Sequence, residues 1–392
     1  MALGSSFGQT FFIGLFSPSI EAAFELSHSQ WGSIYMAGTL LSAATLTFTG
    51  RWIDRLKLRT YALAVCGFLG AACLAAAFSP VAWFLIPMIY LLRQAGQGLA
   101  SHTAVTGMVK YFRRDRGKAV AIATLGFPMG RALLPVATVA AIAAFGWRET
   151  YVGCAALVLL LMFPAVALLL ANDAGGHLTP DSEPERSDSV GQIGDSTEAR
   201  GDRSLRDVFR DPTFYLFLPA ILAPSFFDTA LSFHLLSVAA LKSWTPEWVT
   251  SGYGVYALAT IMASMWMGSL VDQLGAVRMF VFSLVPYVVG TLVLGCFENP
   301  VWAWVYLALY GVGSGVKATL IPVLLSEIYG TRHIGAIRSF VATLSVFASA
   351  LGPPALGMAL DLDATVMAMT SVSLAYFIGA SMLMFMGGRH WK

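Results

Sequence analysis

The sequence predicts an all-α integral membrane protein with twelve transmembrane helices in two six-helix bundles related by a pseudo-two-fold axis. Only 12% of its 392 residues are charged and 57% are hydrophobic, whereas a soluble protein carries about 25% charged residues. Apolar stretches that could cross a bilayer recur along the whole chain. Motifs of the first half also return in the second half. Composition, span length and repetition therefore favour the same fold class.

Twelve apolar stretches come close to or exceed the roughly 20 residues that a transmembrane helix needs. They occupy residues 4–24, 31–50, 60–78, 82–110, 117–144, 147–171, 213–239, 248–271, 276–297, 301–327, 334–360 and 364–386. The connections are short, apart from the polar segment 172–212. That segment is rich in Ser, Asp, Glu and Arg and cannot bury apolar area, so we expect a largely disordered linker. We therefore predict an N-terminal bundle over residues 1–171 and a C-terminal bundle over 213–392.

Lys and Arg are distributed unevenly between the two sides of the membrane. Most of the 24 basic residues follow the even-numbered spans or lie near the C-terminus, whereas only Arg148 and Lys242 lie in connections on the other side. Because cytoplasmic loops carry the excess of Lys and Arg, both termini and the linker are predicted to be cytoplasmic. We expect a monomer in the lipid bilayer of a bacterial inner (plasma) membrane.

The second half repeats the first half at a constant shift along the sequence. Gly50, Asp54 and Leu56 return as Gly268, Asp272 and Leu274, a shift of 218 positions. The same shift pairs Tyr35 with Tyr253, Tyr111 with Tyr329, Gly117 with Gly335, and Pro135 with Pro353. Two parallel six-helix units joined by a linker are typical of transporters.

The stretch GRWIDRLKLR, residues 50–59, places four bases and one Asp between spans 2 and 3. Gly50 would let a neighbouring helix approach closely. Asp54 lies near the C-terminal end of span 2, where its charge opposes the helix dipole unless a base or a helix N-terminus compensates it. We therefore interpret Asp54 as a latch that is paired in one conformation and free in another. For Arg51, Lys57 and Arg59 the alternative is that they only fix the topology.

The pattern Gly50-x-x-x-Asp54-Arg55, followed by bases, resembles the loop motif of the major facilitator superfamily. A second copy, with Gly268, Asp272 and Arg278, lies where that superfamily repeats it. Arg93-Gln-Ala-Gly96-Gln-Gly98 resembles its fourth-helix motif, residues 111–119 its loop between helices 4 and 5, and residues 146–148 the start of its helix 6. The resemblance covers nearly the whole chain. It implies the major facilitator fold, with gating roles for the residues of both loop motifs.

Within this superfamily, the first span resembles the monocarboxylate and oxalate/formate transporter group. Two departures from that group concern the substrate site. Span 8 has no internal Arg or Asp, where the group commonly carries an anion-binding Arg, and span 11 has no mid-span Lys. The resemblance also implies that spans 1, 4, 7 and 10 line a central cavity. His102, Asp228 and Lys317 then become cavity residues, together with Gln9 and Thr10 of span 1.

An ionisable residue inside a span is expected to have a structural or functional role, because inserting a charged side chain at the bilayer centre costs about 2.5–3.5 kcal/mol. Arg131, midway along span 5, is the first candidate for binding an anionic group, since a guanidinium offers a planar fork to a carboxylate. The alternative is a structural ion pair, most simply with Asp228. Lys317 in span 10 is the second substrate-binding candidate, with a similar alternative.

Two residues are candidates for proton coupling, because burial can shift their titration towards neutral pH. They are Asp228 in span 7 and His102 in span 4. The alternative for His102 is a histidine that only hydrogen-bonds between helices. Arg93 in span 4 is interpreted as holding the helices together or coupling protons to gating.

These observations predict a secondary active transporter of a small organic anion, in particular a monocarboxylate, that works by alternating access. Proton coupling is expected because bringing a monoanion into a cell at −100 mV costs about 2.3 kcal/mol. One alternative is a proton-driven exporter of a cationic or amphipathic compound, which Asp228 would serve. From another class, a non-transporting receptor or scaffold would not need titratable mid-span groups.

Other classes of function lack their sequence signals. No convergent catalytic set is present, so we expect no enzyme. The glycines of residues 311–317 lack the Gly-Lys-Ser/Thr triplet of a phosphate loop. The basic loops carry no stacking aromatic residues, so we expect no nucleic acid as a partner. We predict neither a cofactor nor a metal site, and expect only the small-molecule substrate, protons and lipid as partners.

Overall fold

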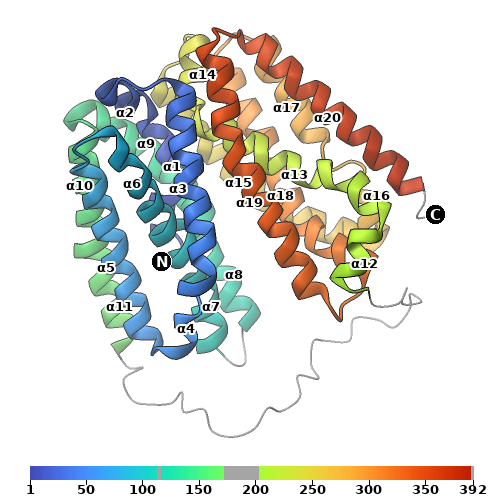
Figure 1. The fold of residues 1–392 in the computed structure, drawn as a ribbon, viewed down its shortest axis with the longest axis horizontal. Helices are drawn as coiled ribbons and strands as arrows, with labels where there is room; N and C mark the ends of the chain where they lie inside the picture. The colour runs from blue at the N-terminus through green and yellow to red at the C-terminus, as the bar shows by residue number, and fades with distance from the viewer. Residues whose placement is uncertain (113–115, 172–202, 390–392) are drawn as a thin grey trace, which may run out of the picture.

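The computed structural model describes residues 1–112, 116–171 and 203–389, and within these ranges all regular structure is helical. Nine helices in this part of the chain are long and apolar enough to cross a membrane. The first and fourth spans are helical but broken into shorter pieces, and the second is a more polar helix. Together they complete the twelve predicted spans. Figure 1 shows the two bundles side by side, the first from blue to green and the second from yellow to red.

The N-terminal bundle comprises the first six spans. Span 1 is η1 (Gly4–Gly8), α1 (Thr10–Ile13), η2 (Gly14–Phe16) and α2 (Ser17–Phe24); span 2 is α3 (His28–Thr49), and α4 (Trp52–Arg55) precedes span 3, α5 (Leu58–Ala77). Span 4 is η3 (Ala82–Phe84), α6 (Leu85–Leu92), the π-helix η4 (Arg93–Ala100) and α7 (Ser101–Tyr111). Span 5 is α8 (Arg116–Thr124) with α9 (Gly126–Phe145), and span 6 is α10 (Trp147–Ala156), the π-helix η5 (Leu157–Met162) and α11 (Phe163–Leu169).

The C-terminal bundle comprises the other six. Span 7 is α13 (Pro212–Phe233) with α14 (Leu235–Leu241), span 8 is α15 (Pro246–Leu274), and span 9 is α16 (Ala276–Phe280) with α17 (Val285–Cys296). Spans 10 to 12 are α18 (Val301–Tyr329), α19 (Ile334–Asp361) and α20 (Val366–Arg389).

The end of the predicted linker 172–212 contains a short helix. The prediction of disorder falls mainly on residues 172–202, which lie outside the described residues. After them, α12 (Leu205–Arg210) starts at a capping box between Ser204 and Asp207. Phe209 of α12 packs edge-on against Phe340 of α19, with ring centres 4.9 Å apart. This part of the linker is therefore docked on the C-terminal bundle.

Helix starts repeat with the shift that the sequence motifs predict. α3 and α15 begin at residues 28 and 246, α5 and α16 at 58 and 276, and α8 and α19 at 116 and 334, so each pair is 218 residues apart. Local caps fix such starts: Ser27 forms a capping box with Gln30 before α3, and Thr245 caps α15. The repeat thus extends from single residues to whole elements.

The bundles meet most closely at the end that carries α2 and α14 in Figure 1. We call this the external end and the opposite one the cytoplasmic end, after the sides that the sequence predicts. At the external end α3 packs along α19, and the Asp361 carboxylate accepts hydrogen bonds from the backbone N–H groups of His28 (2.8 Å) and Ser29 (2.9 Å). Towards the cytoplasmic end, where α4, α8 and α12 lie, the bundles diverge (Figure 1).

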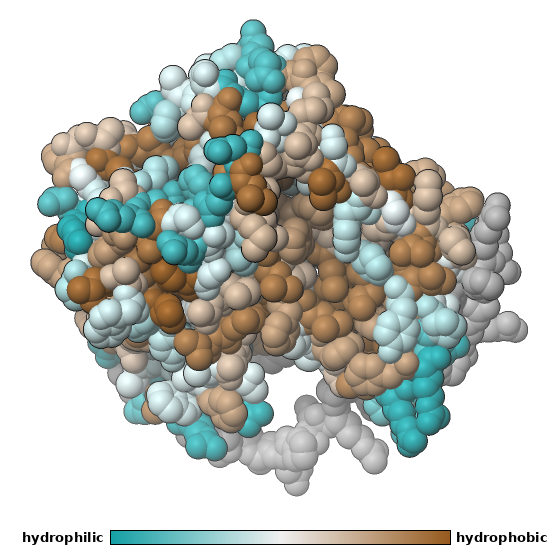
Figure 2. Space-filling model, turned by 45° about the horizontal axis from the view of Figure 1, so that its top comes forward, coloured by the Kyte–Doolittle hydropathy of each residue, from teal (hydrophilic) through white to brown (hydrophobic). Residues whose placement is uncertain are grey.

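Much of the outer surface is apolar. Large hydrophobic side chains such as Phe145, Leu169, Met265 and Val372 are each more than 70% exposed. Figure 2 shows apolar residues over much of the visible face, with hydrophilic ones gathered in patches. An apolar surface of this extent suits contact with lipid hydrocarbon and not with water.

Candidate functional site

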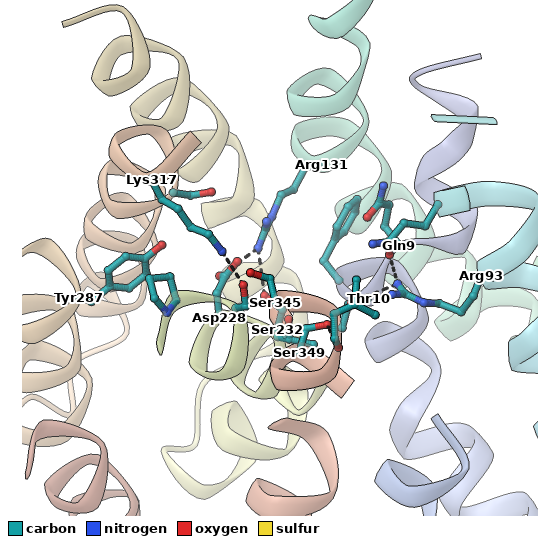
Figure 3. Close-up of a pocket in the computed structure, with 17 residues that line it drawn as sticks. Gln9, Thr10, Arg93, Arg131, Asp228, Ser232, Tyr287, Lys317, Ser345 and Ser349 are labelled. Carbon is teal, nitrogen blue, oxygen red and sulfur yellow. Dashed lines mark hydrogen bonds and ion pairs between the residues drawn. The ribbon is translucent and has the colours of Figure 1, made fainter. Parts of the chain in front are cut away.

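A polar cavity of about 270 Å³ lies between the two bundles. Spans 1, 4 and 5 line it on one side, and spans 7, 9, 10 and 11 on the other (Figure 3). Its wall includes charged side chains, amides and several hydroxyl groups. Because ionisable groups inside a membrane bundle mark solute or ion pathways, this cavity is the candidate site.

Arg131 enters the cavity from the first third of α9, about midway along span 5, with 17% of its side chain exposed. Its Nη2 lies 3.5 Å from Asp228 Oδ1 and donates a hydrogen bond of 3.0 Å to Ser232 Oγ. The guanidinium carbon lies 3.6 Å from the centre of the Tyr256 ring, a cation–π contact. These three partners belong to the C-terminal bundle, so Arg131 connects the bundles across the cavity. The ion pair that the sequence left open as an alternative is therefore present.

Asp228 and Lys317 supply the other charges on the C-terminal side. Asp228 of α13 accepts a hydrogen bond from the Tyr256 hydroxyl at 3.2 Å through its second carboxylate oxygen. Lys317 of α18 donates to Ser225 Oγ at 2.6 Å. Figure 3 shows Arg131 and Lys317 pointing towards Asp228 from opposite sides. One carboxylate thus faces two cations.

Span 1 is interrupted where it reaches the cavity. Gln9 has an extended backbone (φ −83°, ψ 151°) between η1 and α1, and both Gln9 and Thr10 line the cavity. Behind them η1 packs directly on η4, because Gly8 and Gly96 lack side chains. A methyl group at Gly96 would lie 2.6 Å from the Gly8 nitrogen. Discontinuous helices at mid-membrane depth are a recurrent feature of transporter binding sites.

Arg93 lines the cavity but is satisfied mainly within its own bundle. Its Nη1 lies 3.3 Å from both the Gly8 carbonyl oxygen and Thr10 Oγ1, and it also donates to Gln97. Its guanidinium carbon lies 5.2 Å from the centre of the Tyr35 ring. Arg93 therefore braces spans 1, 2 and 4, in agreement with its interpretation as a residue that holds the helices together. It opens the π-helix η4, and such helices occur frequently at functional sites.

The structure brings together all but one of the residues for which the sequence predicts a place in the cavity. Gln9, Thr10, Arg131, Asp228 and Lys317 all line it. His102 does not: it is exposed, and its Nε2 would lie 3.9 Å from a methyl group at Gly50. The reason is helix length, because nine residues from Arg93 to His102 advance the helix by about 13 Å. The prediction that His102 faces the cavity is wrong, and its proton-coupling role stays untested.

The first loop motif contains an ion pair within one bundle. Lys110 Nζ of α7 lies 2.7 Å from Asp54 Oδ1 and donates to the Ile53 carbonyl at 2.9 Å. The hydrogen bond and charge of Lys110 lower the pKa of the Asp54 carboxyl. Arg55 is exposed. The sequence predicts that a neighbouring helix approaches Gly50 closely, and the structure does not show this. A methyl group added at Gly50 would lie 3.9 Å from the His102 side chain of span 4, which is an ordinary contact distance.

The second loop motif has a different contact. Asp272 and Arg278 are exposed, and a methyl group at Gly268 would meet no neighbour within 4 Å. Instead, Glu327 of α18 accepts a 2.7 Å hydrogen bond from the backbone N–H of Ala276, the first residue of α16. In the first copy the end of span 4 is thus tied to the segment between spans 2 and 3, and in the second the end of span 10 is tied to the start of span 9. The gating roles of these residues remain predictions.

The sequence did not predict several residues that line or adjoin the cavity. Tyr256 and Ser232 hold Arg131, and Ser345 and Ser349 of α19 complete the wall. A helical periodicity was available as a signal, because Ser345 and Ser349 are four residues apart and therefore share one helix face. Serine is, however, also common at packed helix interfaces in membranes, so this signal alone does not select a binding site.

Two six-helix bundles around a polar mid-membrane cavity define the class of membrane transporters that work by alternating access. The sequence model of the Major Facilitator Superfamily matches residues 1–353, and the chain belongs to this superfamily. Its members are transporters and not enzymes, in agreement with the absence of a catalytic set in the sequence. The predicted fold and superfamily are confirmed.

Two curated relatives are distant. Over 341 residues the chain is 24% identical to monocarboxylate transporter 12-B of Danio rerio, with 81% of this chain and 71% of that protein covered. Over 370 residues it is 23% identical to riboflavin transporter MCH5 of Saccharomyces cerevisiae, with 86% of this chain and 66% of that protein covered. This chain therefore spans about two thirds of the length of these relatives. The match to a monocarboxylate transporter agrees with the predicted resemblance to that group.

Solved structures of similar fold include a bacterial homologue of the human lysosomal transporter Spinster. Its inward-facing, occupied form superimposes with a TM-score of 0.66 and its inward-facing, unoccupied form with 0.69. Both comparisons cover 99% of this chain and 95% of the other, at 15% sequence identity. At this identity the likeness concerns the fold alone.

Proposed function

We propose that this transporter carries a small organic anion, a monocarboxylate in particular, together with a proton. The observation that supports this proposal is the charge of the cavity. Three basic side chains, Arg93, Arg131 and Lys317, line it with a single carboxylate, Asp228, which leaves a formal excess of two positive charges. An anion relieves this excess, whereas a cation increases it. The charge balance therefore speaks against the alternative of an exporter of cationic compounds.

The size of the cavity supports a small substrate. Its volume of about 270 Å³ is slightly below the range of about 300–1,000 Å³ for sites that hold drug-sized ligands. Its hydroxyl groups can donate hydrogen bonds to the carboxylate oxygens of the substrate. Arg131 makes its polar contacts, with Asp228 and Ser232, across the cavity in the opposite bundle, so binding at Arg131 can be sensed by both halves.

Proton coupling follows from an exchange of partners at Arg131. A proton taken up by Asp228 neutralises its carboxylate and releases Arg131, whose guanidinium then binds the substrate carboxylate. Arg131 has an anionic partner before the exchange, Asp228, and after it, the substrate carboxylate. The net charge of the cavity is therefore the same before and after one proton and one monoanion bind together. The carrier therefore moves no extra charge through the bilayer, where a charge at the centre costs about 2.5–3.5 kcal/mol.

The conformation fits one step of alternating access. Contacts between α3 and α19 and the hydrogen bonds of Asp361 close the external end, and the bundles diverge at the cytoplasmic end (Figure 1). With the predicted orientation, this is an inward-facing state. The Lys and Arg distribution supports a cytoplasmic location of both termini, and we propose a bacterial inner membrane as the host membrane.

Uptake into proteoliposomes tests this function. Purified protein should accumulate a radiolabelled monocarboxylate when the outside is more acidic than the lumen, and should lose accumulation when a protonophore is added.

Arg131→Ala should reduce uptake at least tenfold, because the guanidinium of Arg131 is the proposed anion ligand, while membrane insertion stays normal. Arg206→Ala, at an exposed arginine of α12, is the matched control and should transport normally. Undiminished uptake by Arg131→Ala would exclude Arg131 as the ligand, and uptake of amines but not of carboxylates would exclude the anion assignment.

A further inference from the structure

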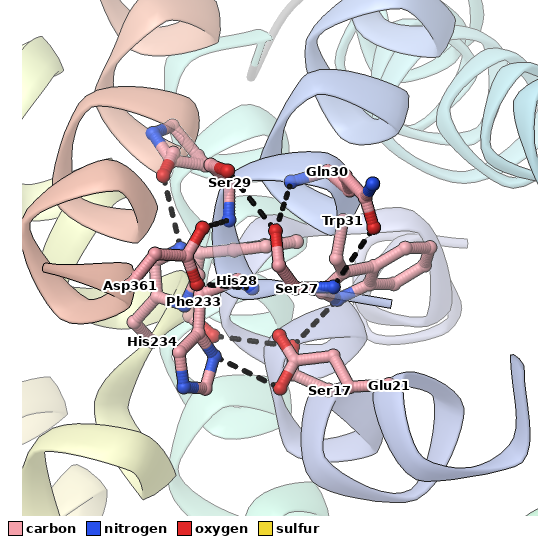
Figure 4. A network of polar contacts seen from close by, with 11 residues as sticks. Ser17, Glu21, Ser27, His28, Ser29, Gln30, Trp31, Phe233, His234 and Asp361 are labelled. Carbon is pink, nitrogen blue, oxygen red and sulfur yellow. Dashed lines mark hydrogen bonds and ion pairs between the residues drawn. The ribbon is translucent and has the colours of Figure 1, made fainter. Parts of the chain in front are cut away.

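A second polar cluster lies at the external end, away from the cavity. Glu21 of α2, His28 at the start of α3 and His234 at the end of α13 each offer one ligand atom, and these three atoms lie within 4.8 Å of one another. Glu21 is 8% exposed and His234 is fully buried. Glu21 and His28 belong to the N-terminal bundle and His234 to the C-terminal bundle (Figure 4). The cluster therefore bridges the two halves where the external end is closed.

Three atoms of this cluster are buried without a hydrogen-bond partner, namely Glu21 Oε1, His28 Nδ1 and His234 Nδ1. His28 Nδ1 does lie 3.0 Å from Glu21 Oε2, as an ion pair if the histidine is protonated. Buried polar atoms of proteins nearly always have a partner, so three such atoms in one cluster point to a missing ligand. The Nε2 of His234 lies 2.9 Å from the Pro353 carbonyl oxygen and therefore carries the proton. This leaves Nδ1 with a free lone pair, as in metal-bound histidines whose other nitrogen donates to a carbonyl.

The surrounding contacts hold the other two ligands in place. His28 Nδ1 lies 3.0 Å from Glu21 Oε2, and the Asp361 carboxylate binds the backbone N–H groups of His28 and Ser29. The side chain of His28 is 34% exposed, which leaves a route for an ion from the external side. Figure 4 marks with dashed lines the contact between His28 and Glu21 and the hydrogen bonds from the His28 and Ser29 backbone to Asp361.

We propose that Glu21, His28 and His234 bind a divalent transition-metal ion, for which Zn²⁺ is the reference, and that the bound ion holds the external end closed. Two histidines and one glutamate are a known zinc ligand set, with water in the fourth position. Nitrogen and carboxylate ligands favour such ions over Mg²⁺ or Ca²⁺. Tetrahedral zinc with bonds of about 2.0–2.1 Å places its ligand atoms about 3.4 Å apart, so small side-chain rotations suffice. The sequence alone did not predict this site, because its ligands are 7 and 206 residues apart along the chain.

Direct metal binding is the first test and does not depend on the transported substrate. The full chain, purified without a polyhistidine tag and stripped with a chelator, is dialysed against Zn²⁺ at a series of concentrations. We expect one ion per chain, with an affinity at least about tenfold lower in His28→Gln and in Glu21→Gln. His333→Ala, which removes an exposed histidine at the cytoplasmic end, should bind as the wild type does. His28→Gln serves as the decisive variant, because His234 also bonds to Pro353 and its removal endangers folding.

The bridging role is tested by distance measurements between spin labels. Labels at Lys57→Cys and Ser339→Cys, in a Cys296→Ser background, report the separation of the two bundles at the cytoplasmic end. Zn²⁺ should increase the long-distance population relative to the short-distance one at least about fivefold, and should leave the distribution of His28→Gln unchanged. The proposal is overturned if no saturable zinc binds, if His28→Gln binds zinc as tightly as the wild type, or if saturating zinc leaves the wild-type distribution unchanged.

Discussion

At the scale of single residues, the ion pair between Arg131 and Asp228 is longer than a strong one. The 3.5 Å between Nη2 and Oδ1 exceeds the approximately 2.7–2.9 Å of a charge-assisted hydrogen bond between ionised groups. Both side chains also stay partly exposed to the cavity, at 17% and 24%. A pair of this kind gains little to offset its desolvation, so a substrate carboxylate can replace Asp228 at low cost. This is the property that the proposed exchange of partners requires.

Asp228→Asn separates binding from proton coupling. The amide keeps the size of the side chain and can still accept a hydrogen bond from Tyr256, but it cannot take up a proton. We expect the variant to exchange internal for external substrate at a rate near that of the wild type. Accumulation driven by a pH gradient should fall at least tenfold. Counterflow and gradient-driven uptake in proteoliposomes measure the two quantities.

The comparison variant is Asp207→Asn, which changes an exposed carboxylate of α12. It should leave both quantities unchanged. If Asp228→Asn accumulates substrate as the wild type does, Asp228 does not carry the proton.

The sequence predicts the charged residues of the site far better than the neutral ones. Arg131, Asp228 and Lys317 were found because an ionisable group inside an apolar span is costly and therefore needs a reason. Ser232 and Tyr256, which hold Arg131, carry no such signal, since hydroxyl groups and aromatic rings are tolerated throughout membrane helices. His102 was misplaced because its position depends on how far along span 4 the cavity extends, which hydropathy does not report.

At the scale of elements, apolar length predicts where spans lie but not where they break. Hydropathy is the same for a continuous helix and for one interrupted at Gln9 or wound as a π-helix from Arg93. The breaks come from the packing of Gly8 against Gly96, a contact between residues 88 positions apart in the sequence. α12 did have a local signal, namely the capping box of Ser204 and Asp207, but the polar composition around it favoured disorder.

The ties between spans and loops differ in chemistry between the two bundles. In the first bundle a lysine of α7 binds a carboxylate between spans 2 and 3, and in the second a carboxylate of α18 accepts from the N–H group at the start of α16. The repeat therefore conserves the place of the contact and not its partners. In this conformation Asp54 is paired within its own bundle, and its role as a latch stays a prediction.

Exchanging the two charges of Asp54 and Lys110 tests the latch. Asp54→Asn and Lys110→Ala should each lower the transport rate severalfold with little change in Tm, because an exposed pair contributes little to stability. The double variant Asp54→Lys with Lys110→Asp should recover most of the rate. Initial uptake rates and thermal melting provide both readouts. Wild-type transport rates in all three variants would show that the pair has no role in gating.

The pH dependence of this pair has a definite sign. Lys110 lowers the pKa of Asp54, so the charged pair is complete above the ordinary carboxyl pKa of about 3.9. It is lost only as the pH falls through the lowered value. Any change in transport between pH 5 and 8 must therefore come from other groups.

At the scale of the whole molecule, the sequence predicts the two bundles but not which end is closed. The predicted spans are the same in every state of an alternating-access cycle, and the states differ only in contacts between bundles. Such states are separated by a few kcal/mol, which composition and periodicity do not resolve. The closed external end depends on contacts such as those of Asp361 with His28 and Ser29, between residues more than 330 positions apart.

Gly357 of α19 is the position where a single methyl group should change this balance. In the closed state a methyl group there would lie 2.5 Å from the carbonyl oxygen of His28, which is backbone and cannot rotate away. Overpacking of this kind costs about 1–3 kcal/mol, and opening of the external end relieves it. We therefore expect Gly357→Ala to shift the population away from the externally closed state by roughly 5–150-fold.

Gly379→Ala is the matched control, because Gly379 is also a helical glycine but a methyl group there meets no neighbour within 4 Å. Both variants gain about 1 kcal/mol of helix propensity, so only the steric effect differs between them. The spin-label pair at residues 57 and 339 should report shorter cytoplasmic distances for Gly357→Ala and wild-type distances for Gly379→Ala. Shorter distances mean that the cytoplasmic end has closed as the external end opened, which is the exchange of access that rigid bundles require. Unchanged distances in Gly357→Ala would mean that the contact between α3 and α19 does not determine which end is open.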